Sequence, residues 1–173
     1  MMAKIEVLKG LRFTPEMFLK RMDKSKKLKN IEVKHMNTVY SLCWIFQYRI
    51  LLQASKNTTR YAGYYGGYDE SVASPGKLAL LPAAEEKEVP DVCILTDKLT
   101  EEEALKASWE YNKRDVTRKF RNLYAPPVLE DHKTDRYYKP LYIFEFYNKE
   151  LDEKKYRILD SLTGDLDEIQ ITE

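Results

Sequence analysis

The chain contains few side chains that could act as nucleophile, base or metal ligand. Its two cysteines are Cys43 and Cys93, and its two histidines are His35 and His132. A nucleophilic site needs a base within hydrogen-bond reach of the nucleophile. On one extended strand His35 and Cys43 would lie about 26 Å apart, so a dyad between them requires a chain reversal. The sequence therefore predicts no catalytic residue, and both cysteines are expected to be small core residues.

Metal, phosphate and cofactor sites are not predicted either. Two Cys and two His far apart give no zinc-ligand spacing. Acidic residues gather at Asp160, Asp165, Asp167 and Glu168, but their spacing fits no calcium loop, and an acidic solvated tail is expected. Residues 63–67 are rich in glycine but lack the Lys-Ser/Thr ending of a phosphate-binding loop.

Tyrosine is enriched, with thirteen Tyr against six Phe and two Trp. Tyrosine suits half-exposed sheet faces and contact surfaces because its ring is apolar and its hydroxyl is polar. Tyr64, Tyr65 and Tyr68 alternate with glycines, which indicates a mobile loop with aromatic contact residues. These three are the predicted anchors of a binding surface. The alternative is that they pack against the second half of the chain as ordinary core.

Positive charge is concentrated in two stretches that are predicted to be helical. The net charge is only +1, from 29 basic and 28 acidic residues, so the chain as a whole is not expected to bind polyanions. The second stretch carries Arg114, Arg118 and Arg121, which are predicted binding residues. This pattern keeps nucleic-acid binding through basic helix faces open as an alternative, although basic solvent faces are common on helices.

An internal repeat organises the chain. Residues 13–20 and 99–106 both read as an apolar residue, a threonine, an acidic first turn and Leu-Lys. Residues 44–48 and 142–146 both read as an aromatic residue, Ile, Phe, a polar residue and an aromatic residue, which is typical of strands. The same order of helix start and strand therefore occurs twice.

The repeat predicts an α+β fold of two tandem units, each a helix followed by an antiparallel β-hairpin. The helices are expected from Pro15 to about Leu28 and from Glu101 to about Leu123, with Thr14 and Thr100 as N-caps. Hairpin turns are expected near residues 56–57 and 152–153. Each helix is expected to lie across one face of its own hairpin, because neither element can bury its apolar face alone. The predicted domains are residues 1–90 and 91–173, or one compact unit.

Two motifs frame the second copy, one at its helix start and one after its last strand. They consist of Thr100, Glu102, Glu103 and Ala104, and of Asp160, Thr163, Gly164 and Asp165. Together they resemble the PepSY domain, a small α+β module of protease propeptides and bacterial envelope proteins. In the first copy Gly63 stands in the place of Asp160. The resemblance implies an inhibitory, chaperoning or interaction module with no catalysis of its own.

Location and function follow from these patterns as expectations. No apolar run approaches the ~18 residues that cross a bilayer, so no membrane span is expected. The N-terminus lacks the apolar region of a secretory signal, so a cytoplasmic location is expected, or an extracytoplasmic one if a leader was removed. The predicted function is a non-enzymatic binding or regulatory module with a protein partner or a second copy of itself. An enzyme with an unrecognised carboxylate or Cys site, and a nucleic-acid binder, are the alternatives.

Overall fold

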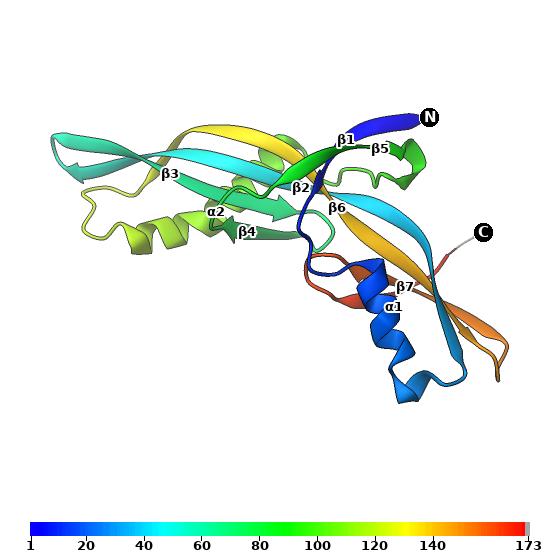
Figure 1. The fold of residues 1–173 in the computed structure, drawn as a ribbon. Coiled ribbons are helices and arrows are strands. Elements are labelled where there is room, and N and C mark those ends of the chain that lie inside the picture. Colours follow the sequence, from blue (N-terminus) through cyan, green and yellow to red (C-terminus); the bar gives the residue numbers. More distant parts are fainter. Residues whose placement is uncertain (172–173) are drawn as a thin grey trace. The chain divides into compact units, whose positions relative to one another are not determined.

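The computed structural model (Figure 1) describes residues 1–171. This part of the chain contains two α-helices, eight β-strands and two short 3₁₀ helices. The helices are α1 (Pro15–Asp23) and α2 (Glu101–Lys119), and the strands are β1 (Met2–Leu8), β2 (Ile31–Ser55), β3 (Thr58–Asp69), β4 (Ser74–Leu78), β5 (Ala84–Pro90), β6 (Val128–Asn148), β7 (Glu153–Asp160) and β8 (Leu166–Ile169). The predicted α+β class is confirmed.

Hydrogen bonds join the eight strands in the order β4-β3-β2-β6-β1-β5, with β7 on β6 and β8 on β7. The pairs β2–β3, β3–β4, β6–β7, β7–β8 and β1–β5 are antiparallel. One bridge, between Tyr40 and Ile94, is parallel. β2 ends at Ser55 and β3 begins at Thr58, as the first predicted turn requires. β6 and β7 form the second predicted hairpin.

The chain forms two compact units, each assembled from separate stretches. Unit 1 contains Met1–Ser41, Ala84–Leu95 and the chain from Tyr138 onward, and unit 2 contains Leu42–Ala83 and Thr96–Tyr137. Strands β2 and β6 therefore each contribute one part to unit 1 and the other part to unit 2. The predicted division into residues 1–90 and 91–173 describes the repeat and not these units, and it stays a prediction.

In unit 2, helix α2 covers strands β2, β3 and β4. The ring of Trp109 meets the ring of Tyr48 edge-on at 5.5 Å between centroids, and Tyr48 stacks on Tyr64 at 6.5 Å. The buried residues of α2 follow one another at a spacing of four: Ala104, Ser108, Asn112 and Val116. Because these side chains are small or polar, the helix approaches the sheet closely. A Cβ on Gly66 of β3 would overlap the side-chain amide of Asn112 on α2.

In unit 1, helix α1 covers strands β6 and β7. The ring of Phe18 lies 4.4 Å from that of Phe144 and 6.3 Å from that of Phe146, centroid to centroid. Leu19 and Met22 come from the same side of the helix, since residues three and four apart share one face. They pack with Phe18 against the buried cluster of Phe144, Phe146 and Leu159.

The expectation that each helix covers its own hairpin is wrong. Helix α1 precedes the β2–β3 hairpin but packs on β6, β7 and the start of β2 (Ile31 and Val33), which lies outside the part of β2 that pairs with β3. Helix α2 precedes the β6–β7 hairpin but packs on β2, β3 and β4. Each hairpin is thus covered by the helix of the other copy. Hydrophobic periodicity shows which face of an element needs cover, but it does not show which element supplies that cover.

Both helices begin at the threonines predicted as N-caps. Thr14 Oγ1 accepts a hydrogen bond from the backbone N–H of Met17 at 3.3 Å. Thr100 and Glu103 form a complete capping box, in which Glu103 N donates to Thr100 Oγ1 at 3.2 Å and Thr100 N donates to Glu103 Oε2 at 2.8 Å. The helix ends lie earlier than expected, at Asp23 and Lys119.

Strand pairing aligns the two hairpins with each other. Trp44 of β2 pairs with Tyr68 of β3, and Tyr142 of β6 pairs with Leu159 of β7. Trp44 and Tyr142 are the first residues of the repeated five-residue strand motif. Their partners therefore hold equivalent places, and an aspartate follows each partner.

These two aspartates, Asp69 and Asp160, end their strands in the same kind of turn. Asp69 Oδ1 accepts from the backbone N–H of Ser71 at 3.0 Å, and Asp160 Oδ1 accepts from that of Leu162 at 2.8 Å. Such side-chain-to-backbone bonds two residues ahead are typical of Asx turns. Asp69 thus holds the place that the sequence comparison assigned to Gly63, because the first hairpin is the longer of the two.

Candidate functional site

The tyrosine-rich segment 63–68 is a strand and not a mobile loop, because it lies within β3. Tyr64 is buried, and its hydroxyl donates a hydrogen bond to the Asp115 carboxylate. Burial raises the pKa of Tyr64, and the hydrogen bond to Asp115 raises it further. Tyr64 is therefore core of unit 2, packed against a helix of the second copy, as the alternative reading of the sequence held.

The six predicted binding residues do not form one site. Tyr65 and Tyr68 are half-buried in β3. Arg114 and Arg118 are exposed on α2, and Arg121 is exposed just beyond its end. The tyrosines and the arginines thus belong to different elements and differ in their access to solvent.

A buried polar network lies beneath α2. The Tyr48 hydroxyl and Ser108 Oγ are hydrogen-bonded, and Asn112 Nδ2 donates to the Ser108 carbonyl at 2.8 Å and to the Gly76 carbonyl at 3.0 Å. Burial raises the pKa of Tyr48 to about 12, against the lowering effect of its hydrogen bonds with Ser108 and Asn112. Because Ser108 and Asn112 are fully buried, this network fixes the helix on the sheet and is closed to a substrate.

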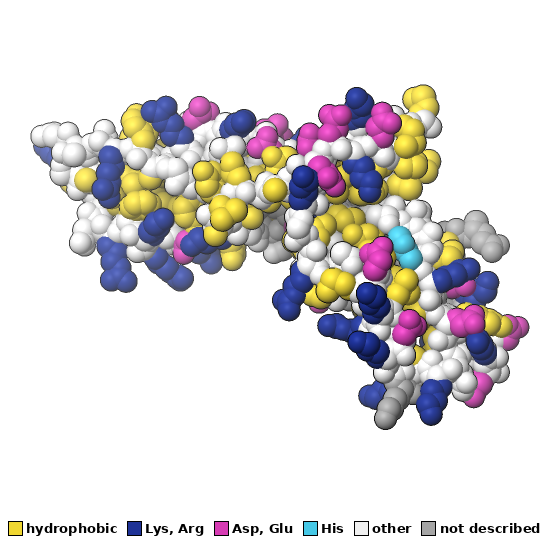
Figure 2. Space-filling view, in the orientation of Figure 1, with side chains coloured by type: hydrophobic (Ala, Val, Ile, Leu, Met, Phe, Trp, Pro, Cys, Tyr) yellow, Lys and Arg dark blue, Asp and Glu magenta, His cyan; other side chains and the backbone are white. Residues whose placement is uncertain are grey.

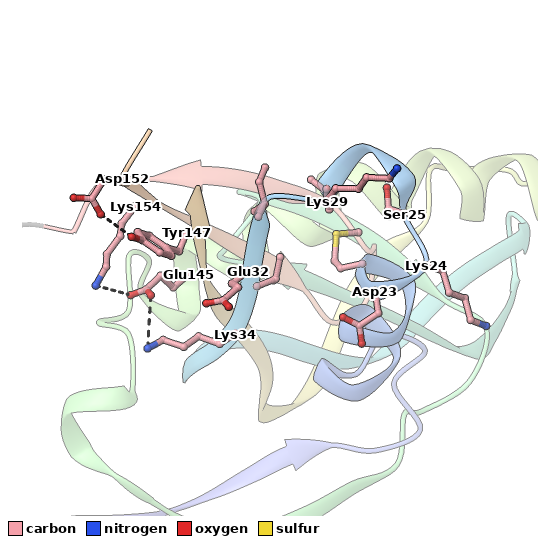
Figure 3. A pocket seen from close by; sticks show the side chains of 14 residues that line it. Asp23, Lys24, Ser25, Lys29, Glu32, Lys34, Glu145, Tyr147, Asp152 and Lys154 are labelled. Atoms are coloured by element: carbon pink, nitrogen blue, oxygen red, sulfur yellow. Dashed lines mark hydrogen bonds and ion pairs between the residues drawn. The ribbon is translucent and has the colours of Figure 1, made fainter. Parts of the chain in front are cut away.

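A hollow of about 960 Å³ lies in unit 1 (Figure 3). Its walls come from the end of α1, the connection to β2, the start of β2 and the tip of the β6–β7 hairpin. The charges on its walls balance, with Asp23, Glu32, Glu145 and Asp152 against Lys24, Lys29, Lys34 and Lys154. A wall of both signs matches a ligand that also carries both signs, because complementary potentials favour association.

Strand β2 separates the side chains of this hollow into two groups, as Figure 3 shows. Ile31 and Val33 pack into the apolar cluster under α1. Successive strand residues point to opposite faces, so Glu32 and Lys34 point away from α1. There they lie on the same side as Glu145.

Glu145 is the buried charge of this second group. Its side chain is only 8% exposed, and its carboxylate lies 3.6 Å from Lys34 Nζ and 3.9 Å from Lys154 Nζ. Hydrogen bonds of this kind are shorter, at about 2.7–3.2 Å. In the described part of the chain, neither lysine therefore donates a short hydrogen bond to Glu145. A carboxylate accepts up to about four hydrogen bonds, so Glu145 has capacity left for donors on a ligand.

The neighbouring side chains hold the tip of the hairpin in place. The Tyr147 hydroxyl donates to Asp152 Oδ1 at 2.7 Å, and this hydrogen bond raises the pKa of Tyr147. Lys149 Nζ lies 2.8 Å from Glu32 Oε1. Sequence reasoning missed this group. The available signal was the position of Glu145 between Phe144 and Phe146, because strand alternation turns it to the opposite face.

A second hollow of about 290 Å³ adjoins the first and is mainly apolar. The two share Met22, Leu28 and Ile31 as lining residues. The second is also lined by the apolar side chains of Phe146, Leu151 and Leu166. Leu151, at the hairpin tip, is 64% exposed. Unit 1 therefore presents two hollows that share three apolar lining residues, and the charged side chains around Glu145 lie on the other face of β2.

His35 and Cys43 do not form the dyad that the sequence left open. His35 Nε2 is hydrogen-bonded to the Asn37 carbonyl at 3.0 Å and to Thr38 Oγ1 at 3.1 Å. His35 and Cys43 both lie on β2, without the chain reversal that a dyad requires. Residues 1–171 contain no group of three His, Cys, Asp or Glu side chains placed to hold a metal ion. Neither described helix combines the length and apolar character needed to cross a membrane.

Comparison of the chain with protein-family models, with curated proteins and with solved structures gave no match.

Proposed function

We propose that the chain is a non-enzymatic binding module, made of two diverged copies of one helix–hairpin unit, which binds a polypeptide segment of a protein partner. The binding site is the pair of adjoining hollows in unit 1. The observation that carries this proposal is that Met22, Leu28 and Ile31 line both hollows, while the ion pairs of Glu145 lie on the opposite face of the strands.

The repeat is supported by three matching features. Both copies have the order helix, long strand, turn and returning strand. Both helices begin at a threonine cap. Asp69 and Asp160 end equivalent strands in equivalent turns. The resemblance to the PepSY domain is part of this proposal; the first copy carries the aspartate at the end of its hairpin, with Val72 and Ala73 in the places of Thr163 and Gly164.

A polypeptide is the ligand class that fits both hollows. It offers apolar side chains for the smaller hollow, and charged side chains and backbone N–H groups for Glu145 and its lysines. Protein interfaces combine an apolar core with a polar rim in this way. A polyanion would instead face Asp23, Glu32 and Asp152 in the larger hollow.

The proposal can be tested with a photo-crosslinking amino acid at either of two exposed leucines. Leu151 lines the apolar hollow and is 64% exposed, whereas Leu80 belongs to unit 2 and is 70% exposed. In cells, a protein crosslinked from position 151 and not from position 80 is expected. In titration calorimetry with the purified partner, Leu151→Asp should weaken binding about tenfold or more, and Leu80→Asp should leave it unchanged.

Other results of this experiment would contradict the proposed partner. A product of two copies of the chain, crosslinked from position 151, would assign the hollows to self-association. Equal crosslinking from both positions would show non-specific capture. A bound peptide released in cleaved form would favour the enzyme alternative, since the larger hollow is lined by several carboxylates.

A further inference from the structure

The two halves of helix α2 carry opposite charge. Its first turn is acidic, with Glu101, Glu102 and Glu103, whereas basic residues follow from position 113. A helix dipole favours cations in the last turn, which accounts for Arg118 and Lys119. The helix dipole does not account for Arg114, which lies before the last turn, or for Arg121, which lies after it. It also does not account for Lys77 of strand β4, which lines the same hollow as Arg114 and Arg118. Lys77, Arg114 and Arg118 line one hollow, and together with Arg121 just beyond the helix they are named the basic surface of unit 2.

The arginines of this surface are not held in close ion pairs, although Asp115 lies near Arg118 and interacts with its charge. Lys77 Nζ binds Asp115 at 2.7 Å, and this contact lowers the pKa of Asp115 together with the hydrogen bond from Tyr64. Among the described residues, no carboxylate forms an ion pair with Arg114, Arg118 or Arg121. All three are exposed. Figure 2 shows Lys and Arg side chains gathered over this part of unit 2.

Aromatic side chains stand among these cations. Tyr111 is 54% exposed and lines a hollow of about 260 Å³ with Lys77, Arg114, Asp115 and Arg118. Tyr124, beyond the helix, is 62% exposed, and its backbone N–H donates to the Gln53 carbonyl at 2.8 Å. Arginines bind phosphates, and exposed rings stack on unpaired bases.

We infer that the basic surface of unit 2 binds single-stranded nucleic acid, with Arg114, Arg118 and Arg121 on phosphates and Tyr111 stacked on a base. Exposed arginines attract any polyanion, and among polyanions a nucleic acid with unpaired bases also gains from stacking on an exposed ring beside them. A duplex keeps its bases stacked inside, so Tyr111 would gain nothing from it. This surface lies in unit 2, and its residues are not part of the proposed peptide site in unit 1. A result that contradicts one proposal therefore leaves the other standing.

The test is fluorescence anisotropy with a labelled oligo(dT) or oligo(U) of 20 nucleotides, at several salt concentrations. The triple variant R114A/R118A/R121A should lose most of the affinity, and its plot of log K against log salt should be shallower by about 2. The matched control is K20A/R21A/K27A, which removes three exposed cations from unit 1. That control should bind like the wild type.

Two further measurements separate stacking from charge. Tyr111→Ala should weaken binding about fivefold or more, and Tyr111→Phe should restore it, because stacking needs the ring and not the hydroxyl. Equal losses in both triple variants would show attraction by net charge and overturn the inference. Arg-dependent binding of poly-glutamate, with oligonucleotides unbound, would assign the surface to an acidic protein. Equal affinity for a duplex would also overturn it.

Discussion

The ring of Phe18 lies 4.4 Å from the ring of Phe144, centroid to centroid, at an interplanar angle of 44°. Phe18 belongs to the helix that precedes the first hairpin, and Phe144 belongs to the second hairpin. This contact places the helix of one copy on the sheet of the other. It also makes unit 1 depend on segments from both ends of the chain.

A double-mutant cycle measures this exchange of helices. Phe18→Leu and Phe144→Leu should each lower the free energy of unfolding. The double variant should lower it by less than the sum of the two single effects. A coupling of about 0.5–1.5 kcal/mol is expected, as for aromatic pairs in general. Urea unfolding of the four proteins gives the value. If helix α1 covered its own hairpin, Phe18 would instead be coupled to Phe46. A coupling energy of zero between Phe18 and Phe144 would contradict the packing described.

Gly66→Ala should destabilise unit 2 by about 1–3 kcal/mol, because the new Cβ would overlap Asn112 and the Tyr48 ring. Gly63→Ala is the matched control on the same strand, since its Cβ would meet nothing within 4 Å. That control should stay within about 0.5 kcal/mol of the wild type. Thermal or urea unfolding reports both values. Equal effects of the two variants would mean that α2 does not approach the sheet at Gly66.

The buried ion pair of unit 1 should be sensitive to loss of its cation. Lys139 is fully buried, and its Nζ lies 2.5 Å from Asp160 Oδ2. Lys139→Met leaves the Asp160 charge uncompensated and should cost about 3–5 kcal/mol in the free energy of unfolding. Lys149→Met breaks an exposed pair with Glu32 and should cost at most about 1 kcal/mol.

Adding Asp160→Asn to Lys139→Met should recover part of this loss, because the uncompensated charge is then removed. Part of the loss should remain, since Asp160 also accepts backbone hydrogen bonds from Leu162 and Thr163. If Lys139→Met lowered the free energy of unfolding as little as Lys149→Met, the Lys139–Asp160 pair would be solvated in solution.

Stability should fall in alkaline solution. Burial raises the pKa of Tyr48 to about 12. Above about pH 10 the unfolded chain releases tyrosine protons that the folded chain retains, so the free energy of unfolding decreases as pH rises from about 10 to 12. Below pH 10 this contribution is fully present and does not change. Urea midpoints at pH 8, 10 and 11 measure it.

Tyr48→Phe should make the decrease in the free energy of unfolding with pH shallower, because phenylalanine has no hydroxyl proton that the folded chain could retain. The absorbance of ionised tyrosine at 295 nm gives an independent measurement in the folded protein. Thirteen tyrosines titrating together near pH 10 would contradict the raised pKa of Tyr48.

The sequence predicted the features that depend on neighbouring residues. The capping box of Thr100 and Glu103 needs only a spacing of three, and the hairpin turns need only the break between two strand patterns. It failed where burial depends on distant partners. Tyr64 among glycines resembles a flexible loop, but pairing with β2 and β4 and cover by α2 make it core.

The acidic stretch 85–88 shows the same limit. Its composition indicates a linker, but it lies in β5, paired with β1 at the end of the strand order. Charged residues on an edge strand discourage pairing with other chains. An edge strand of this kind therefore has the same charged composition as a linker. Strand alternation indicated the face on which Glu145 lies, but not its partners, because Lys34 and Lys154 reach it from strands far apart in the sequence.

The exchange of helices sets the order in which surfaces can be buried during synthesis. The β2–β3 hairpin is complete at Asp69, but its helical cover ends only at Lys119. Helix α1 is synthesised first, but its packing partners Phe144 and Leu159 are synthesised much later. The nascent N-terminal half therefore exposes an aromatic sheet face with nothing to cover it. Folding therefore depends on contacts between segments far apart in the sequence, which are slow to form, and a half-length chain exposes apolar surface that chaperones bind.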